Sequence, residues 1–218
     1  MDGVLVDVSE SYRETITRTV EHFTGRPVSR QAIQEYKNAG GWNDDWQLSH
    51  HLVHAAGVDA SYEDVKAHFQ GLFHGLNGTP GLMLRERWIA NPGVLETLSR
   101  RFRFALFTGR PKDEAQITLD RLAGGLTFEP IIGMYEIENH KPAPDGILRV
   151  LRSYPDTPAY YVGDTIDDAR AAHAAAVPFI GIAAPDNPLH LELVTIFQDQ
   201  GARAILADIN YLPEVFGE

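Results

Sequence analysis

Three short polar stretches of this sequence carry side chains that could act together on a phosphate group. The hydroxyl of Thr108 and the backbone N–H of Gly109 can hold phosphate oxygens. Lys141 adds positive charge where a phosphoryl group and a carboxylate must meet. Asp164 and Asp168 are four residues apart, so at a helix start they share a face and offer the hard oxygen ligands that Mg²⁺ prefers. Together these residues predict magnesium-assisted phosphoryl chemistry.

Each of these signals is weak when it is taken alone. Thr108 could be a turn residue, Lys141 a solvated charge, and Asp168 a carboxylate that only complements a helix N-terminus. Their common position favours the joint interpretation, because each stretch lies near the end of a short apolar run or before a helix.

From residue 91 onward, short apolar runs alternate with helical patterns, which predicts a parallel sheet covered on both faces. Ligands of such sheets bind at the carboxyl ends of the strands, where these polar stretches lie. The predicted strands are 104–107, 130–133, 160–162, 179–182 and 204–206, and the predicted helices are 94–98, 113–122, 145–152, 167–176 and 189–198.

Residues 9–90 are predicted to be helices joined by polar turns, without a strand. Ser11 and Glu14 have the spacing of a capping box at the start of the first helix, which Gly25 ends. The other helices are predicted after Ser29 up to Gly40, over 43–56, and from Ser61 onward, and Asn77-Gly78-Thr79 is predicted to be a turn.

Four segments of the chain resemble, in order and spacing, the motifs of the haloacid dehalogenase-like (HAD) hydrolase superfamily. They are Met1-Asp2-Gly3-Val4-Leu5-Val6-Asp7, Thr108, Lys141 in Lys-Pro-Ala-Pro-Asp, and Gly163-Asp164-Thr165-Ile166-Asp167-Asp168. The resemblance implies an α/β fold, with a doubly wound parallel (Rossmann-like) sheet core and an inserted all-helical cap domain. The implied limits are 1–8 and 91–218 for the core and 9–90 for the cap.

The resemblance also implies a mechanism. In the family, the first Asp of the first motif attacks phosphorus and forms an aspartyl-phosphate. The Asp two residues later, here Asp2, protonates the leaving oxygen and then activates water, which favours phosphatases and phosphomutases over dehalogenases. Mg²⁺ is held by the nucleophile, the backbone carbonyl of Asp2 and Asp164, with Asp168 close by. The implied catalytic residues are Asp2, Thr108 and Lys141, and the implied metal ligands are Asp2, Asp164 and Asp168.

One departure from the family pattern concerns the nucleophile, whose expected position is immediately before Met1. The family places that residue on a central strand, between the strands predicted at 104–107 and 160–162. We therefore expect a truncated reading frame, with the nucleophile absent from this chain and its activity impaired. Two alternatives are a strand at 3–6 that ends at Asp7, and a catalytically inactive ligand-binding relative.

Substrate choice in capped members of the family comes from the cap, and the most unusual segment there is 38–46. Its glycines, tryptophans and Asn-Asp-Asp run suit a loop that leans over a small ligand. In the alternative interpretation, Asn43 only caps a helix while Trp42 and Trp46 pack in the cap. The predicted substrate-binding residues are Thr108, Gly109, Arg110, Trp42, Asn43 and Trp46. His50 and His54 are four residues apart, but two ligands alone make a poor metal site.

Composition narrows the possible partners. The formal net charge of −11 disfavours nucleic acid and anionic membranes, and no apolar run is long enough to span a bilayer. Absence of cysteine excludes thiolate metal sites and fits a reducing compartment, so a cytoplasmic location is expected. The predicted function is a Mg²⁺-dependent phosphatase for a small phosphorylated metabolite, with a phosphomutase as the alternative. The sequence leaves sugar phosphates, phosphoglycolate-like acids and nucleotides open as substrates.

Overall fold

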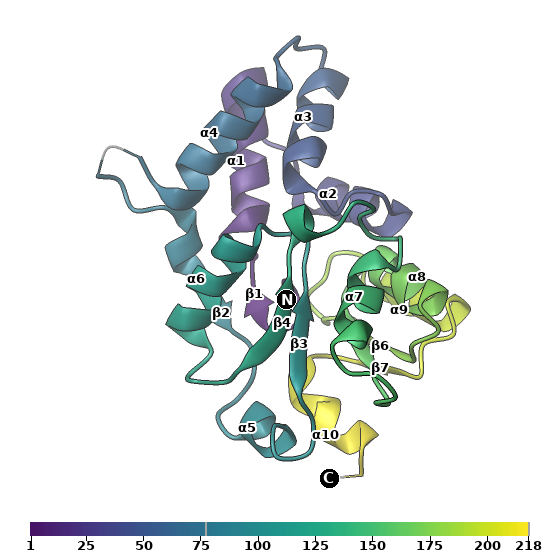
Figure 1. Ribbon diagram of the computed structural model, residues 1–218. Helices are drawn as coiled ribbons and strands as arrows, with labels where there is room; N and C mark the ends of the chain where they lie inside the picture. Colours follow the sequence, from purple (N-terminus) through teal and green to yellow (C-terminus); the bar gives the residue numbers. More distant parts are fainter. Residues whose placement is uncertain (77, 218) are drawn as a thin grey trace.

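The computed structural model describes residues 1–76 and 78–217 and has a helical cap above an α/β core (Figure 1). Asn77, which belongs to a predicted turn, lies outside the described residues. The α-helices are α1 Tyr12–Thr24, α2 Arg30–Ala39, α3 Asp45–Ala55, α4 Tyr62–His74, α5 Val94–Leu98, α6 Lys112–Leu122, α7 Asp145–Arg152, α8 Ile166–Ala174, α9 His190–Asp199 and α10 Leu212–Val215, and the short 3-10 helices are η1 Leu82–Arg85, η2 Met134–Glu136 and η3 Ile209–Tyr211. The strands are β1 Val6–Asp7, β2 Arg87–Trp88, β3 Phe104–Phe107, β4 Phe128–Ile132, β5 Tyr161–Gly163, β6 Phe179–Ile182 and β7 Ala204–Leu206.

The core strands form two parallel sheets. β3 pairs with β4, and β5, β6 and β7 pair in that order. Within the described residues no strand pairing joins β3 to β5, and the family resemblance implies a central strand between these two. Helices between the parallel strands complete the predicted α/β class, which is confirmed.

A short antiparallel pair, β1 with β2, corrects two sequence predictions. β2 lies in the stretch that was predicted to be only helical, because the two crossings of the chain between core and cap lie side by side and pair there. Residues 3–5 form a turn rather than a strand. The carboxylate of Asp7 accepts hydrogen bonds from the Ser9 N–H and from Arg87, so the alternative that puts Asp7 in the site is wrong.

The helical cap, α1–α4, is built around fully buried aromatic and aliphatic side chains, among them Ile16, Phe69 and Phe73. Ser29 and Ser61 accept hydrogen bonds from the first turns of α2 and α4, as predicted. The capping box predicted at Ser11 is wrong. Its hydroxyl is buried without a hydrogen-bond partner, while Glu14 pairs with Arg18 on the helix surface. No helix in the described part of the chain is both long and apolar enough to cross a membrane.

A buried carboxylate of the core joins the cap to α6. Glu114 accepts a hydrogen bond of 2.5 Å from the Tyr12 hydroxyl and one of 3.1 Å from the Gln70 amide. The His74 ring lies 2.9 Å from the same carboxylate. This contact raises the pKa of His74, mainly through the hydrogen bond to Glu114, while burial opposes the shift.

The contribution of His74 to stability should depend on pH. Because its pKa is raised on folding, that contribution is complete below the unfolded pKa and is lost as pH rises through the folded value. We expect His74→Gln to destabilise the protein more at pH 6 than at pH 9, by less than about 1 kcal/mol because the imidazole is partly exposed. Urea unfolding at both pH values measures this. His173→Gln, at an exposed position on α8, should show no such difference, and an equal effect of the two substitutions would contradict the assignment.

Candidate active site

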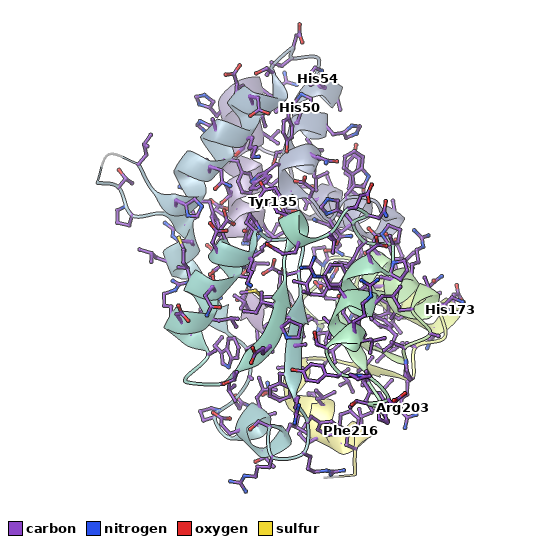
Figure 2. All side chains as sticks on the ribbon, in the orientation of Figure 1. His50, His54, Tyr135, His173, Arg203 and Phe216 are labelled. Carbon is purple, nitrogen blue, oxygen red and sulfur yellow. The ribbon has the colours of Figure 1, made fainter. Side chains whose placement is uncertain are left out.

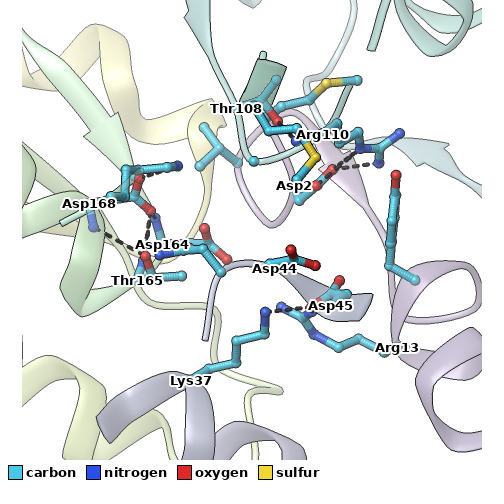
Figure 3. Close-up of a pocket in the computed structure, with 18 of the residues that line it drawn as sticks. Asp2, Arg13, Lys37, Asp44, Asp45, Thr108, Arg110, Asp164, Thr165 and Asp168 are labelled. Atoms are coloured by element: carbon cyan, nitrogen blue, oxygen red, sulfur yellow. Dashed lines mark hydrogen bonds and ion pairs between the residues drawn. The ribbon is translucent and has the colours of Figure 1, made fainter. Parts of the chain in front are cut away.

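A cleft between the strand ends of the core and the cap collects most of the predicted site residues (Figure 3). It encloses about 690 Å³, part of it open to solvent. The predicted residues that line it are Asp2, Thr108, Gly109, Arg110, Lys141, Asp164, Asp168, Asn43 and Trp46. The structure does not bring Trp42 to the cleft. The Trp42 ring packs against Tyr36 and His51 within the cap, which is the alternative considered for it.

The core wall of the cleft contains a buried ion pair between Lys141 and Asp168, with Nζ and Oδ1 at 2.8 Å. The same oxygen accepts a hydrogen bond from Tyr161, and the other oxygen accepts from the N–H and hydroxyl of Thr165. Burial raises the pKa of Asp168, but the charge of Lys141 and the hydrogen bonds to the carboxylate together outweigh burial and lower this pKa to about 2. For Lys141, burial lowers the pKa, but the charge of Asp168 raises it, and the net shift of the Lys141 pKa is upward. Both groups are therefore charged at neutral pH.

Asp164 has no such cationic partner in the described residues. Burial, followed by the charge of Asp168, raises the pKa of Asp164 to about 6. Its carboxylate lies directly over Gly3, where an added Cβ would come within 2.1 Å of Oδ2. Gly3 also has a φ of +64°, so the close approach of Asp164 to the Asp2-Gly3 peptide depends on glycine there.

The fit of this site to Mg²⁺ rests on Asp164. A cation would relieve the repulsion between two neighbouring carboxylates, and the Asp2-Gly3 peptide lies beside it. Asp168 instead gives both oxygens to hydrogen-bond donors of the protein. In residues 1–76 and 78–217 no three His, Asp or Glu side chains are gathered to hold a metal. Of the predicted ligands, Asp164 and the Asp2 carbonyl would therefore hold Mg²⁺, whereas Asp168 pairs with Lys141.

The carboxylate of Asp2 is held by Arg110, whose Nε lies 2.9 and 3.1 Å from the two oxygens. Burial raises the pKa of Asp2, but the charge and hydrogen bonds of Arg110 lower it, and the net shift of this pKa is downward. Arg110 in turn lies over the Tyr12 ring at 4.4 Å and has an ion pair of 2.7 Å with the buried Glu86. Glu86 Oε1 makes this contact without hydrogen-bond geometry, and its other oxygen accepts from Arg121 and Thr118.

A core carboxylate also positions the loop 40–44 of the cap. Asp167 Oδ2 accepts hydrogen bonds of 2.6 Å from Gly41 N–H and 2.7 Å from the Asn43 amide. Gly40 has a φ of +86° and lies so close to Arg170 and Asp167 that a Cβ would contact them. Asn43 is thus a loop anchor, and the residue that caps α3 is Asp44, whose Oδ1 accepts from the N–H groups of Trp46 and Gln47.

The cap also contributes charged residues to the cleft that were not predicted as site residues, and these are Arg13, Lys37, Asp44 and Asp45. Lys37 is buried and donates to Asp45 and to the Trp42 carbonyl, both at 2.5 Å, and Arg13 also pairs with Asp45. Only the Asn-Asp-Asp run gave a sequence signal for this wall. His50 and His54 both reach the Ala60 carbonyl at the end of the cap away from the core (Figure 2).

Comparison with known proteins agrees with the fold. The sequence profile of the haloacid dehalogenase-like hydrolases matches residues 1–182, so the chain belongs to this family. It is 35% identical over 201 residues to an imidazoleglycerol-phosphate dehydratase of Phytophthora nicotianae, covering 86% of this chain but only 43% of that protein. It is 26% identical over 226 residues to a phosphoglycolate phosphatase of Pseudomonas fluorescens, covering 99% of this chain and 80% of that protein.

Solved structures share the fold at low sequence identity. A haloacid dehalogenase-like protein of unknown function from Agrobacterium tumefaciens superposes with a TM-score of 0.72 at 20% identity, covering 99% of this chain and 94% of that one. The phosphatase Tt82 from Thermococcus thioreducens gives a TM-score of 0.66 at 21% identity, covering 100% and 97%.

Glu86 should be one of the most sensitive positions near the cleft. Glu86→Gln leaves two arginines beside a neutral amide, and we expect a loss of about 3 kcal/mol or more in the free energy of unfolding. Glu10→Gln removes an exposed carboxylate that also pairs with two arginines and should cost less than about 1 kcal/mol. Chemical unfolding of both variants tests this, and equal losses would show that the buried network does not contribute specially.

The anchor at Asn43 should hold the loop 40–44 against the core. Asn43→Ala removes a hydrogen bond to the buried Asp167, for which we expect a loss of about 1.5–3 kcal/mol and faster amide hydrogen exchange in that loop. Asn139→Ala removes an exposed hydrogen bond to a carboxylate and is the matched control. Unchanged exchange in the loop of the Asn43 variant would contradict the anchoring role.

Proposed function

We propose that this hydrolase is a Mg²⁺-dependent phosphatase that cleaves a small phosphate monoester through an aspartyl-phosphate intermediate. The observation that carries the proposal is that Thr108, Lys141 and Asp164 line one cleft. The relatives named above include phosphoglycolate phosphatases, and another is named for imidazoleglycerol phosphate, so both names refer to a small phosphorylated metabolite. The proposed partner is such a metabolite, and the proposed location is the cytoplasm.

The proposed nucleophile is an Asp at the position before Met1. The α-amine of Met1 is buried, which lowers its pKa, and it interacts with the charges of Asp2, Lys141, Asp168 and Asp164. The chain position before Met1 therefore adjoins the groups that would handle the phosphate.

The side chains of the cleft have distinct proposed roles. Thr108 and the Gly109 N–H hold phosphate oxygens, and Lys141, fixed by Asp168, stabilises the charge of the phosphoryl group. When bound at Asp164 and the Asp2 carbonyl, Mg²⁺ would neutralise phosphate charge and orient the attack. Asp2 is ionised while Arg110 holds it, so in this arrangement it can accept a proton from water. To protonate the leaving oxygen, Asp2 must first take up a proton from solvent, which the charge and hydrogen bonds of Arg110 disfavour.

A paired assay tests the proposed function. One protein is the 218-residue chain, and the other carries a short apolar strand and an Asp before Met1. We expect the extended protein to release phosphate from an aryl phosphate with Mg²⁺, to lose at least about 100-fold in rate with Lys141→Ala, and to stop with a chelator. The 218-residue chain should show little turnover.

The control is the extended protein with Asn in place of the added Asp, which should fold with the same melting temperature and remain inactive. If the extended protein folds and releases no phosphate from any monoester, the phosphatase proposal fails. Product analysis with a sugar phosphate separates the phosphomutase alternative, because a mutase keeps the phosphate on the sugar.

A further inference from the structure

Asp44 has a carboxylate oxygen that the protein does not use. Its Oδ1 caps α3, but no donor in the described residues binds Oδ2. The side chain projects into the cleft between the cap and the core (Figure 3). A carboxylate oxygen in this position can only accept hydrogen bonds, so it requires a donor from whatever binds there.

The place of Asp44 follows from two adjoining cavities. A second cavity encloses about 550 Å³, part of it open to solvent. It continues to Gln47 and His140 over the apolar side chains of Phe107 and Ile137. The residues that line both cavities are Asn43, Asp44, Thr108, Gly109, Met134 and Lys141. Asp44 therefore lies on the cap side where the cavities meet, with Thr108 and Lys141 on the core side. A ligand whose phosphate is held by Thr108 and Lys141 would extend into the space that Asp44 borders.

The cap wall of the cleft has no surplus positive charge. Its cations are Arg13 and Lys37, and its carboxylates are Asp44 and Asp45. Both cations pair with Asp45, and Lys37 is further held by the Trp42 carbonyl. A second anionic group on the ligand would lie near the unpaired Asp44 without a matching cation, and would lose its hydration there.

We propose that this cleft selects phosphate monoesters whose non-phosphate part carries hydroxyl groups, and that Asp44 rejects those that carry a carboxylate. A hydroxyl donates to Asp44 Oδ2 and can accept from the Gln47 amide, whereas a carboxylate has no proton to donate to Asp44 and is repelled by its charge. The preference rests on the proposed function, since it assumes that Thr108 and Lys141 hold the phosphate. It separates this chain from a phosphatase for an acid such as phosphoglycolate.

The test measures binding to the 218-residue chain by calorimetry with Mg²⁺, so that it does not depend on turnover. The ligands are glycerol 3-phosphate, phosphoglycolate and inorganic phosphate, the last as a reference for the phosphate site. We expect glycerol 3-phosphate to bind roughly tenfold more tightly than phosphoglycolate. In Asp44→Asn the ratio should fall close to one, because Asn still caps α3 while the charge is gone. Asp44→Ser, which also supplies an N-cap, guards against a defect peculiar to the Asn variant.

Asp59→Asn is the matched control, because Asp59 is exposed on the cap and lines neither cavity. It should leave the binding ratio of the wild type unchanged. The inference is overturned if phosphoglycolate binds as tightly as glycerol 3-phosphate, if the Asp44 variants keep the wild-type ratio, or if Asp59→Asn changes it equally. If inorganic phosphate and both esters fail to bind, the proposed function fails together with the inference.

Discussion

The ion pair between Lys141 and Asp168 determines the chemistry available to the rest of the cleft. Charges removed from water cost several kcal/mol each unless they are paired and hydrogen-bonded. Here Asp168 meets that requirement with Lys141, Tyr161 and Thr165. The pair joins the loop before α7 to the start of α8 and keeps the lysine charged at the strand ends. Burial, followed by the charge of Asp168, raises the pKa of the neighbouring Asp164. Because Asp168 is paired with Lys141 and Asp164 is not, Asp164 is the carboxylate proposed to bind a cation.

The cap, like the core, has one carboxylate that is paired with cations and one that is not. Asp45 binds both Lys37 and Arg13, while Asp44 keeps one oxygen unpaired at the cleft. On the core side the unpaired carboxylate, Asp164, adjoins the Asp2-Gly3 peptide, which favours a metal ion. On the cap side the unpaired oxygen of Asp44 faces the cleft, which favours a hydrogen-bond donor. The two unpaired carboxylates thus have two different proposed uses, because their surroundings differ.

The sequence predicted the core elements well because local signals determine them. Strands β3, β6 and β7 are continuous apolar runs bounded by turn residues, and their limits match the predicted ones. The gathering of Thr108, Lys141 and Asp164 followed from the rule that parallel strands present their carboxyl ends at one edge. The predicted domain limits and the roles of the individual site residues stay predictions.

Long-range pairing decided what the sequence analysis did not predict. Asn43 and Asp44 are adjacent and both are good N-caps, so only the position of Asp167 in space makes one the loop anchor and the other the cap. Lys37 and Arg13 lie on ordinary polar helix faces, and nothing local shows that they meet at Asp45. Trp42 carried no signal to distinguish a ligand contact from packing on its own domain.

The contact between Arg110 and Tyr12 links the position of the cap to the state of Asp2. Arg110 belongs to the core and holds the Asp2 carboxylate, while its guanidinium lies over a ring that belongs to α1. Tyr12 is itself fixed by its hydrogen bond to Glu114 on α6. A movement of the cap that displaced this ring would remove a stabilising contact from Arg110 and weaken its hold on Asp2. In the proposed mechanism Asp2 must take up a proton before it can act as an acid, and the charge of Arg110 disfavours that state, so cap position and proton transfer would be coupled through one buried guanidinium.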